Sequence, residues 1–115
     1  MANLTGFKRD NDGLYIDKDP DANVQYGLDF TDYLNSGDTV TSADVTIETI
    51  TGDSSPLAFP TNEATDVLVT GGVLVSIRLE GGTVNNIYTV KCKIVTTQGD
   101  TDARSFRIVV KERLL

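Results

Sequence analysis

Apolar and polar residues alternate along several stretches of this chain, and this two-residue period constrains the fold more than any other feature. Over Asn23–Phe30 the even positions are apolar and the odd positions are small or polar. The same period runs through Ala43–Glu48, Val73–Glu80, Tyr88–Ile94 and Ser105–Lys111. Because successive side chains of a β-strand point to opposite faces, each stretch predicts a strand with one buried face. No stretch of ten residues has the 3.6-residue apolar period of a helix, so the sequence predicts an all-β chain.

Glycine-, asparagine- and proline-containing segments separate these strands. Gly71-Gly72 joins the short apolar piece Val67–Val69 to the strand that begins at Val73, a length suited to a tight hairpin. Thr31–Leu34 has room for one helical turn and no more. About seven short strands with such spacing are typical of a two-layer antiparallel β-sandwich. Other turns or loops are predicted at Asn35–Asp38, Asp53–Pro60, Gly81-Gly82 and Gln98–Asp100.

The length of the chain, 115 residues, is that of a single domain with one core. Met1–Gly13 shows no alternation and contains the polar run Lys8–Asp12. We therefore expect an N-terminal arm over residues 1–13, held loosely or ordered only on a partner, and a sandwich over residues 14–115. The predicted inward-facing side chains are Val24, Tyr26, Leu28, Val75, Ile77, Val90, Cys92, Ile94, Phe106 and Ile108.

Tyr88 begins the next-to-last strand, directly after the loop Gly81–Asn86. A tyrosine at this position is the tyrosine corner of immunoglobulin-like domains, in which the hydroxyl bonds to backbone a few residues upstream. The sequence thus predicts an immunoglobulin-like sandwich. Cys92, the single cysteine, lies on the inward side of the same strand, where we expect a small buried side chain and not a reactive thiol.

The composition excludes several classes of function. The chain has no histidine, so imidazole-based nucleophile activation, acid–base catalysis and metal binding are absent, and we expect no enzyme, no catalytic residue and no cofactor. A net charge of −7 argues against nucleic acid as a partner. No apolar run approaches the roughly 20 residues that cross a bilayer, and the N-terminus lacks the layout of a signal peptide. One cysteine that cannot form an intrachain disulfide fits a reducing compartment, so we expect cytosolic synthesis.

Asp17, Asp19 and Asp21 are the candidate metal ligands, since carboxylates two residues apart can converge on Ca²⁺. An EF-hand loop starting at Asp17 requires glycine where Ala22 stands and glutamate where Leu28 stands, so a solvated turn is favoured. Sugar-stacking aromatic residues are few, and tryptophan is absent. A carbohydrate- or calcium-binding module is kept as the alternative function.

Charge is distributed unevenly along the sequence. Residues 1–77 hold thirteen acids and three bases, whereas residues 78–115 hold four acids and seven bases. One interpretation is that four late bases, Arg104, Arg107, Lys111 and Arg113, form a basic strip that faces an acidic patch on another copy or on a neighbouring protein. The alternative is a set of solvated strand faces without such a role. The candidate partner-binding residues are Lys8, Arg9, Arg104, Arg107, Lys111 and Arg113.

Several motifs, spread over roughly residues 17–113, resemble a small family of tailed-bacteriophage virion proteins. The family pattern has a Lys-Asp-Pro stretch before a strand that ends in aspartate and an aromatic residue. It continues with a Gly-Gly turn, a tyrosine-led strand and a basic terminal strand. This sequence has Phe30 and Tyr33 where tryptophans are expected. The matching segments are Lys18–Ala22, Tyr26–Leu34, Gly37–Val40, Leu79–Gly82, Tyr88–Val90, Ile94–Gly99 and Arg104–Arg113.

This resemblance implies an immunoglobulin-like fiber–tail adaptor, or a related decoration protein of the phage head, neck or tail. It implies no enzymatic activity, no cofactor and no catalytic residues. The implied partners are other virion proteins of the capsid, neck, tail or fiber, with several copies or a homo-oligomer in the particle. The implied location is the virion, assembled in the cytoplasm of the host bacterium.

Overall fold

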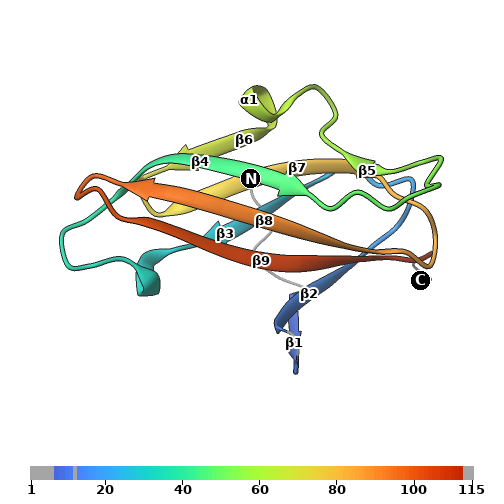
Figure 1. Ribbon diagram of the computed structural model, residues 1–115, viewed down its shortest axis with the longest axis horizontal. Coiled ribbons are helices and arrows are strands. Elements are labelled where there is room, and N and C mark those ends of the chain that lie inside the picture. Colours follow the sequence, from blue (N-terminus) through green and yellow to red (C-terminus); the bar gives the residue numbers. More distant parts are fainter. Residues whose placement is uncertain (1–6, 12, 113–115) are drawn as a thin grey trace.

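Two β-sheets pack face to face in the computed structural model, which describes residues 7–11 and 13–112 (Figure 1). The larger sheet has the strand order β1-β2-β9-β8-β4. Its strands are β1 (Lys8–Asp10), β2 (Gly13–Lys18), β4 (Val40–Ile47), β8 (Ile87–Thr96) and β9 (Thr101–Val110).

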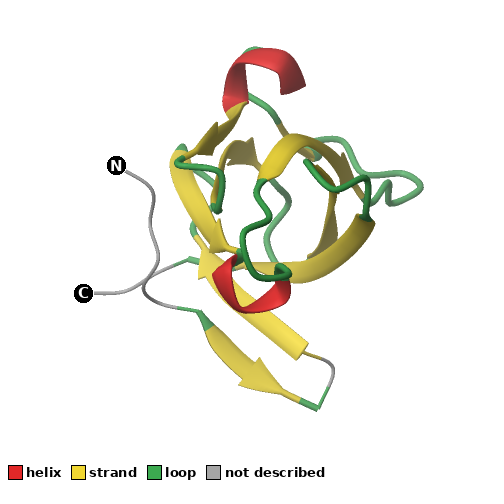
Figure 2. Cartoon of the chain, turned by 90° about the vertical axis from the view of Figure 1, so that its left-hand side faces the viewer, coloured by secondary structure: helices red, strands yellow, loops and turns green. Residues whose placement is uncertain are grey.

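The central strand of the smaller sheet is β7. Strand β3 pairs with one edge of β7, and β5 and β6 both pair with the other edge. A 3₁₀ turn at Thr31–Tyr33 follows β3, as the sequence predicted, and a one-turn helix precedes β6. Seen along the strands, the two sheets curve around a common core (Figure 2). These elements are β3 (Val24–Asp29), β5 (Leu57–Ala58), α1 (Glu63–Asp66), β6 (Val67–Thr70) and β7 (Leu74–Gly81).

The predicted inward face is confirmed. Eight of the ten predicted side chains are buried, and Val24 and Leu28 are partly buried and pack against the others. The alternation therefore set the register correctly, because a slip of one residue would have turned the whole set outward. The eight are Tyr26, Val75, Ile77, Val90, Cys92, Ile94, Phe106 and Ile108.

The strand count and one pairing differ from the prediction. The described residues form nine strands instead of about seven, and β2 runs parallel to β9, with Tyr15 beside Arg107 and Lys18 beside Val110. All other strand pairs are antiparallel. A parallel pair is possible because six strands, β3 to β8, separate β2 from β9 in the chain. A two-residue period carries no information on strand direction. The immunoglobulin-like topology stays a prediction.

The expected N-terminal arm is partly structured. Lys8–Asp10 pairs with β2, and the Phe7 ring packs edge-on against Tyr26 and Phe106, with centroid distances of 6.2 and 5.5 Å. Within residues 7–11, Phe7 contacts the core and β1 has backbone partners, so this part of the expected arm has contacts with the sandwich. Residues 1–6 lie outside the described range, and the domain division at residue 13 stays a prediction. The β1–β2 hairpin itself projects from the body of the sandwich (Figure 2).

The tyrosine corner is confirmed. The backbone N–H of Thr83, five residues upstream, donates to the Tyr88 hydroxyl at 3.1 Å. The hydroxyl in turn donates to Asp53, which also accepts from the Thr83 hydroxyl. These two hydrogen bonds lower the pKa of Asp53, and Asp53 thereby ties the β4–β5 loop to the loop before β8.

Candidate partner-binding surface

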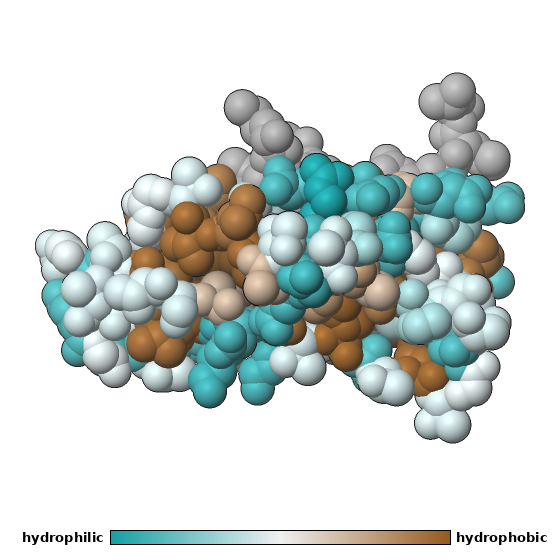
Figure 3. Space-filling view, turned by 90° about the horizontal axis from the view of Figure 1, so that it is seen from above, coloured by the Kyte–Doolittle hydropathy of each residue, from teal (hydrophilic) through white to brown (hydrophobic). Residues whose placement is uncertain are grey.

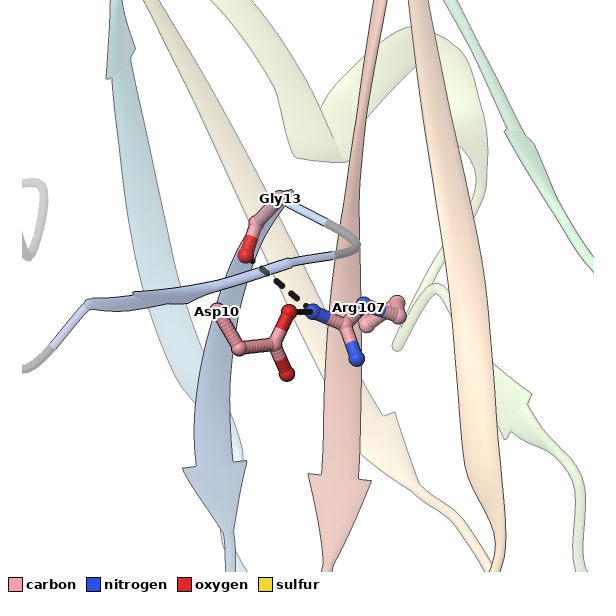
Figure 4. A network of polar contacts seen from close by, with 3 residues as sticks. All are labelled: Asp10, Gly13 and Arg107. Atoms are coloured by element: carbon pink, nitrogen blue, oxygen red, sulfur yellow. Dashed lines mark hydrogen bonds and ion pairs between the residues drawn. The ribbon is translucent and has the colours of Figure 1, made fainter.

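Arg107, a predicted partner-binding residue, holds the β1–β2 hairpin to β9. Its guanidinium donates to Asp10 Oδ1 at 2.5 Å and to the Gly13 carbonyl at 3.1 Å (Figure 4). It also lies 5.3 Å from the centre of the Tyr15 ring, and its side chain is only 19% exposed. The charge of Arg107 is thus directed at its own chain.

Lys8 and Lys111 share one acidic partner, Asp17, on the outer face of the larger sheet. Lys111 Nζ lies 3.2 Å from Asp17 Oδ2, and Lys8 Nζ lies 4.0 Å from the same oxygen. Both lysine side chains remain more than half exposed, and Arg9 is exposed on β1. Solvated ion pairs of this kind are weak, so these three cations remain accessible to another molecule.

Arg104 lies on the face of β9 opposite to Arg107, so these two arginines do not share one basic strip. The β8–β9 register runs without a shift from Thr101 to Val109, and residues three apart on a strand point in opposite directions. Arg104 instead lies 3.3 Å from Asp102 and 4.2 Å above the centre of the Tyr33 ring. This separation was readable in the sequence, from the odd spacing of Arg104 and Arg107. Arg113 lies outside the described residues, and partner binding by all six residues stays a prediction.

The sandwich is open between β3 and the first half of β9, a feature that the sequence reasoning missed. A cavity of about 400 Å³ lies there, and its lining includes four aromatic residues, Phe7, Phe30, Tyr33 and Phe106, together with Arg104. Tyr33 is 48% exposed. The signal in the sequence was an aromatic residue in the supposed arm and another in the turn after β3, both outside the alternating stretches.

The three candidate metal ligands have different surroundings. Asp17 faces Lys8 and Lys111, Asp19 accepts the backbone N–H of Asp21 at 2.9 Å, and Asp21 is exposed. Within residues 7–11 and 13–112, no three histidine, cysteine, aspartate or glutamate side chains are grouped so as to hold a metal ion. The run Asp17–Asp21 is a strand end followed by a side-chain-stabilised turn.

Lys18 is a buried cation that the sequence reasoning did not identify. It is 1% exposed and donates to the carbonyls of Gly81 at 2.7 Å and Asp19 at 2.9 Å. Burial lowers the pKa of Lys18, while Asp19, Asp21 and Glu80 act in the opposite direction. The lysine therefore joins the end of β2 to the end of β7, and its role is structural.

Cys92 is buried, as predicted. Burial raises the pKa of its thiol to about 12, with Asp44 and Glu63 adding to the effect. Since the thiolate is the reactive form, this sulfur is inert at neutral pH in the folded protein.

In the part of the chain that the structure describes, no helix is long and apolar enough to cross a membrane.

Comparison with known proteins identifies the family. Residues 18–109 match the family described as podophage GP4 fiber-tail adaptor protein gp77. The match begins at the buried Lys18, the last residue of β2, and ends one residue before the end of β9. It therefore includes the whole smaller sheet together with β4, β8 and nearly all of β9. No curated protein matches the chain. Because the match spans most of the sequence, the chain belongs to the podophage GP4 fiber-tail adaptor protein gp77 family.

Proposed function

We propose that this protein is a non-enzymatic structural component of a tailed-phage particle that joins a fiber to the tail. The family match over residues 18–109 is the observation that carries this proposal, since it covers nearly the whole sandwich and names an adaptor. An adaptor contacts other virion proteins, and its place is the virion. We propose that it is incorporated while the particle is assembled in the host cytoplasm.

The β1–β2 hairpin is the proposed contact with a virion neighbour. It projects from the sandwich (Figure 2), and Arg107 holds it beside its turn, through Asp10 and Gly13 (Figure 4). Lys8 and Arg9 on β1 are exposed to solvent. Lys111 extends the same basic region from the end of β9, and Arg113 follows it in the sequence. In this proposal Arg107 positions the hairpin, while Lys8, Arg9, Lys111 and Arg113 contact the partner, together with the rest of residues 1–13.

The adaptor role is tested on phage particles made without this protein. We expect particles with a normal capsid and tail that lack fiber proteins, as measured by mass spectrometry of purified particles. Supplying the protein from a plasmid should restore the fibers. Particles that keep their fibers without this protein would contradict the adaptor role and indicate a decoration protein.

The hairpin contact is tested by supplying Lys8→Glu with Arg9→Glu in the same complementation. We expect this variant to fold but to be depleted from particles, because two exposed cations become anions. Lys91→Glu with Lys93→Glu, two exposed changes on β8 that alter the net charge equally, is the matched control and should be incorporated normally. Normal incorporation of the double variant would place the contact elsewhere on the molecule.

A further inference from the structure

The first half of β9 is an open strand edge. Pairing with β2 begins only at Arg107, and no described strand lies beside residues 101–105 on the side away from β8. Thr101, Ala103, Arg104 and Ser105 are all exposed. A strand edge with unpaired N–H and C=O groups is a template for another strand.

The direction of the free backbone groups follows from the hydrogen bonds at the two ends of the β8–β9 pair. Val110 N–H donates to the Asn86 carbonyl at 3.0 Å, and Thr96 N–H donates to the Asp100 carbonyl at 2.8 Å. Antiparallel pairs alternate between bonded and non-bonded residues, and this register has no shift. The even-numbered residues of β9 therefore bond to β8, and the odd-numbered residues turn their N–H and C=O groups to the open edge.

Two further hydrogen bonds agree with this assignment. Lys111 N–H, also odd-numbered, donates to the Lys18 carbonyl on the β2 side at 2.9 Å. Ala103 N–H donates to the Asp102 carboxylate, the side chain of its own neighbour, at 2.8 Å. The open edge thus offers the backbone groups of Thr101, Ala103 and Ser105.

The sequence of this edge, Thr101-Asp102-Ala103-Arg104-Ser105, is complementary to itself when read in the opposite direction. In an antiparallel pair of two copies centred on Ala103, threonine faces serine and aspartate faces arginine on both sides of the centre. We propose that two copies of this protein associate through residues 101–105 of β9, related by a two-fold axis at Ala103.

The direction of the backbone N–H and C=O groups and the positions of the charged side chains both agree with this pairing. Ala103 would bond to Ala103 of the second copy, and Thr101 to Ser105, using the groups that face the open edge. Asp102 and Arg104 then occupy the non-bonded positions, where facing side chains approach most closely. They lie on the same face of β9, already 3.3 Å apart within one chain, so each arginine gains a second carboxylate.

The edge is short, which limits the strength of the association. The β2–β9 pairing begins at Arg107, and the β1–β2 hairpin projects from that point. The pairing between two copies is therefore confined to about five residues of β9. Such an interface is smaller than the standard size for stable complexes, so we expect dimers whose fraction rises with concentration. This association is separate from the adaptor role and is tested on the purified protein alone.

The decisive experiment compares the dimerisation of wild type with that of the single variants Asp102→Arg and Arg104→Asp. Sedimentation equilibrium measures dimerisation from micromolar concentrations to about 1 mM. Wild type should dimerise, and each single variant should dimerise at least about tenfold more weakly, because like charges then face each other at both positions. An equimolar mixture of the two variants should form a heterodimer, since every facing pair becomes arginine and aspartate. The chain carrying both changes should dimerise as wild type does.

A second variant tests the backbone without changing charge. Ala103→Pro removes an N–H that faces the open edge and leaves the bonds to β8 intact, so the folded protein should remain monomeric. Lys91→Glu on β8, one strand in from the open edge, changes the charge as much as Arg104→Asp does. It is the control for that charge variant and should dimerise normally. A wild type that stays monomeric up to about 1 mM, or a variant mixture that forms no heterodimer, would overturn the proposal.

Discussion

Two stretches of strand edge in the larger sheet, one on β4 and one on β9, are covered differently. On β4, the buried Val45 donates its backbone N–H to Glu63 Oε2 at 2.6 Å, while β6 lies alongside. On β9, Ala103 is exposed, and its N–H bonds to the adjacent Asp102. The first edge is closed by a distant part of the chain, whereas the second carries only a local carboxylate that a new strand can displace.

The segment that covers the β4 edge, α1 and the residues before it, is held in place by its own side-chain hydrogen bonds. The Asn62 side chain caps α1 by accepting the Thr65 N–H at 2.9 Å. Asp66, at the other end of the turn, accepts the N–H groups of Thr61 and Asn62 at 2.8 and 3.0 Å. Seen from this side, hydrophobic side chains reach the surface in separate patches among hydrophilic ones (Figure 3). An edge closed by such specific contacts is protected from pairing with other chains, which the β9 edge is not.

The largest expected effect tests whether the side chains on the inner face of β9, beside its open edge, are packed in the hydrophobic core. Phe106→Ala should lower the free energy of unfolding by about 3–5 kcal/mol, because Phe106 is 2% exposed and packs against Phe7 and Tyr26. Urea denaturation measures the change. Ser105→Ala, one residue away and exposed, is the control and should stay within about 0.5 kcal/mol. A loss below about 1 kcal/mol for Phe106→Ala would mean that the open side is solvated and not packed.

The next prediction compares the two carboxylates that bond to edge N–H groups. Glu63→Ala should cost about 1–3 kcal/mol, since it leaves the N–H of buried Val45 without its acceptor. Asp102→Ala should cost less than about 0.5 kcal/mol, because water replaces the carboxylate at exposed Ala103. Equal losses in thermal or urea unfolding would show that the two edges do not differ in stability.

A smaller effect separates the two arginines of β9. Arg107→Glu should destabilise the protein by about 1–2 kcal/mol, because it removes the bonds to Asp10 and the Gly13 carbonyl and places two acids together. Arg104→Glu should remain within about 0.5 kcal/mol, since its side chain is half exposed. Hydrogen exchange of the hairpin amides locates the effect. Protection of β1 that is unchanged in Arg107→Glu would contradict the holding role of Arg107.

The last prediction concerns the loop that continues from the covered edge. Asp53 has a lowered pKa because Thr83 and Tyr88 donate to it, so it stabilises the folded state above the ordinary carboxyl pKa of 3.8. That contribution should be lost as the pH falls below this value and through the lower pKa of the folded state. In Asp53→Asn, stability should depend less steeply on pH between 4 and 2, as thermal melting would show. Identical profiles for both proteins would indicate that Asp53 is not involved.

Much of the fold was readable because the alternating strands have one apolar face. The first two strands were not, since β2 places Lys18 at a buried position and carries Asp17 beside it, which hides the period. Strand direction and the neighbours of β9 are tertiary properties that a local period does not contain. Phe7 shows the same limit, because its partners Tyr26 and Phe106 are distant in sequence.

The exposure of several candidate partner-binding residues was predictable from the sequence, but their geometry was not, and their binding to a partner stays a prediction. Lys8, Arg9 and Lys111 are accessible, as a charge-based reading expects. The inward bonds of Arg107 depend on a hairpin that the sequence did not predict, so its role was missed. The self-complementary edge at residues 101–105 is visible in the sequence only once the structure shows which neighbours β9 lacks.

The rate at which a thiol reagent labels Cys92 measures how often the core of this protein opens. In the register of the larger sheet it lies between Val45 on β4 and Arg104 on β9, midway between the two edges. A buried thiol with a pKa near 12 reacts with an alkylating reagent only when the surrounding strands separate, so the rate of labelling counts those events. With no other cysteine in the chain, every labelled molecule reports on this one position.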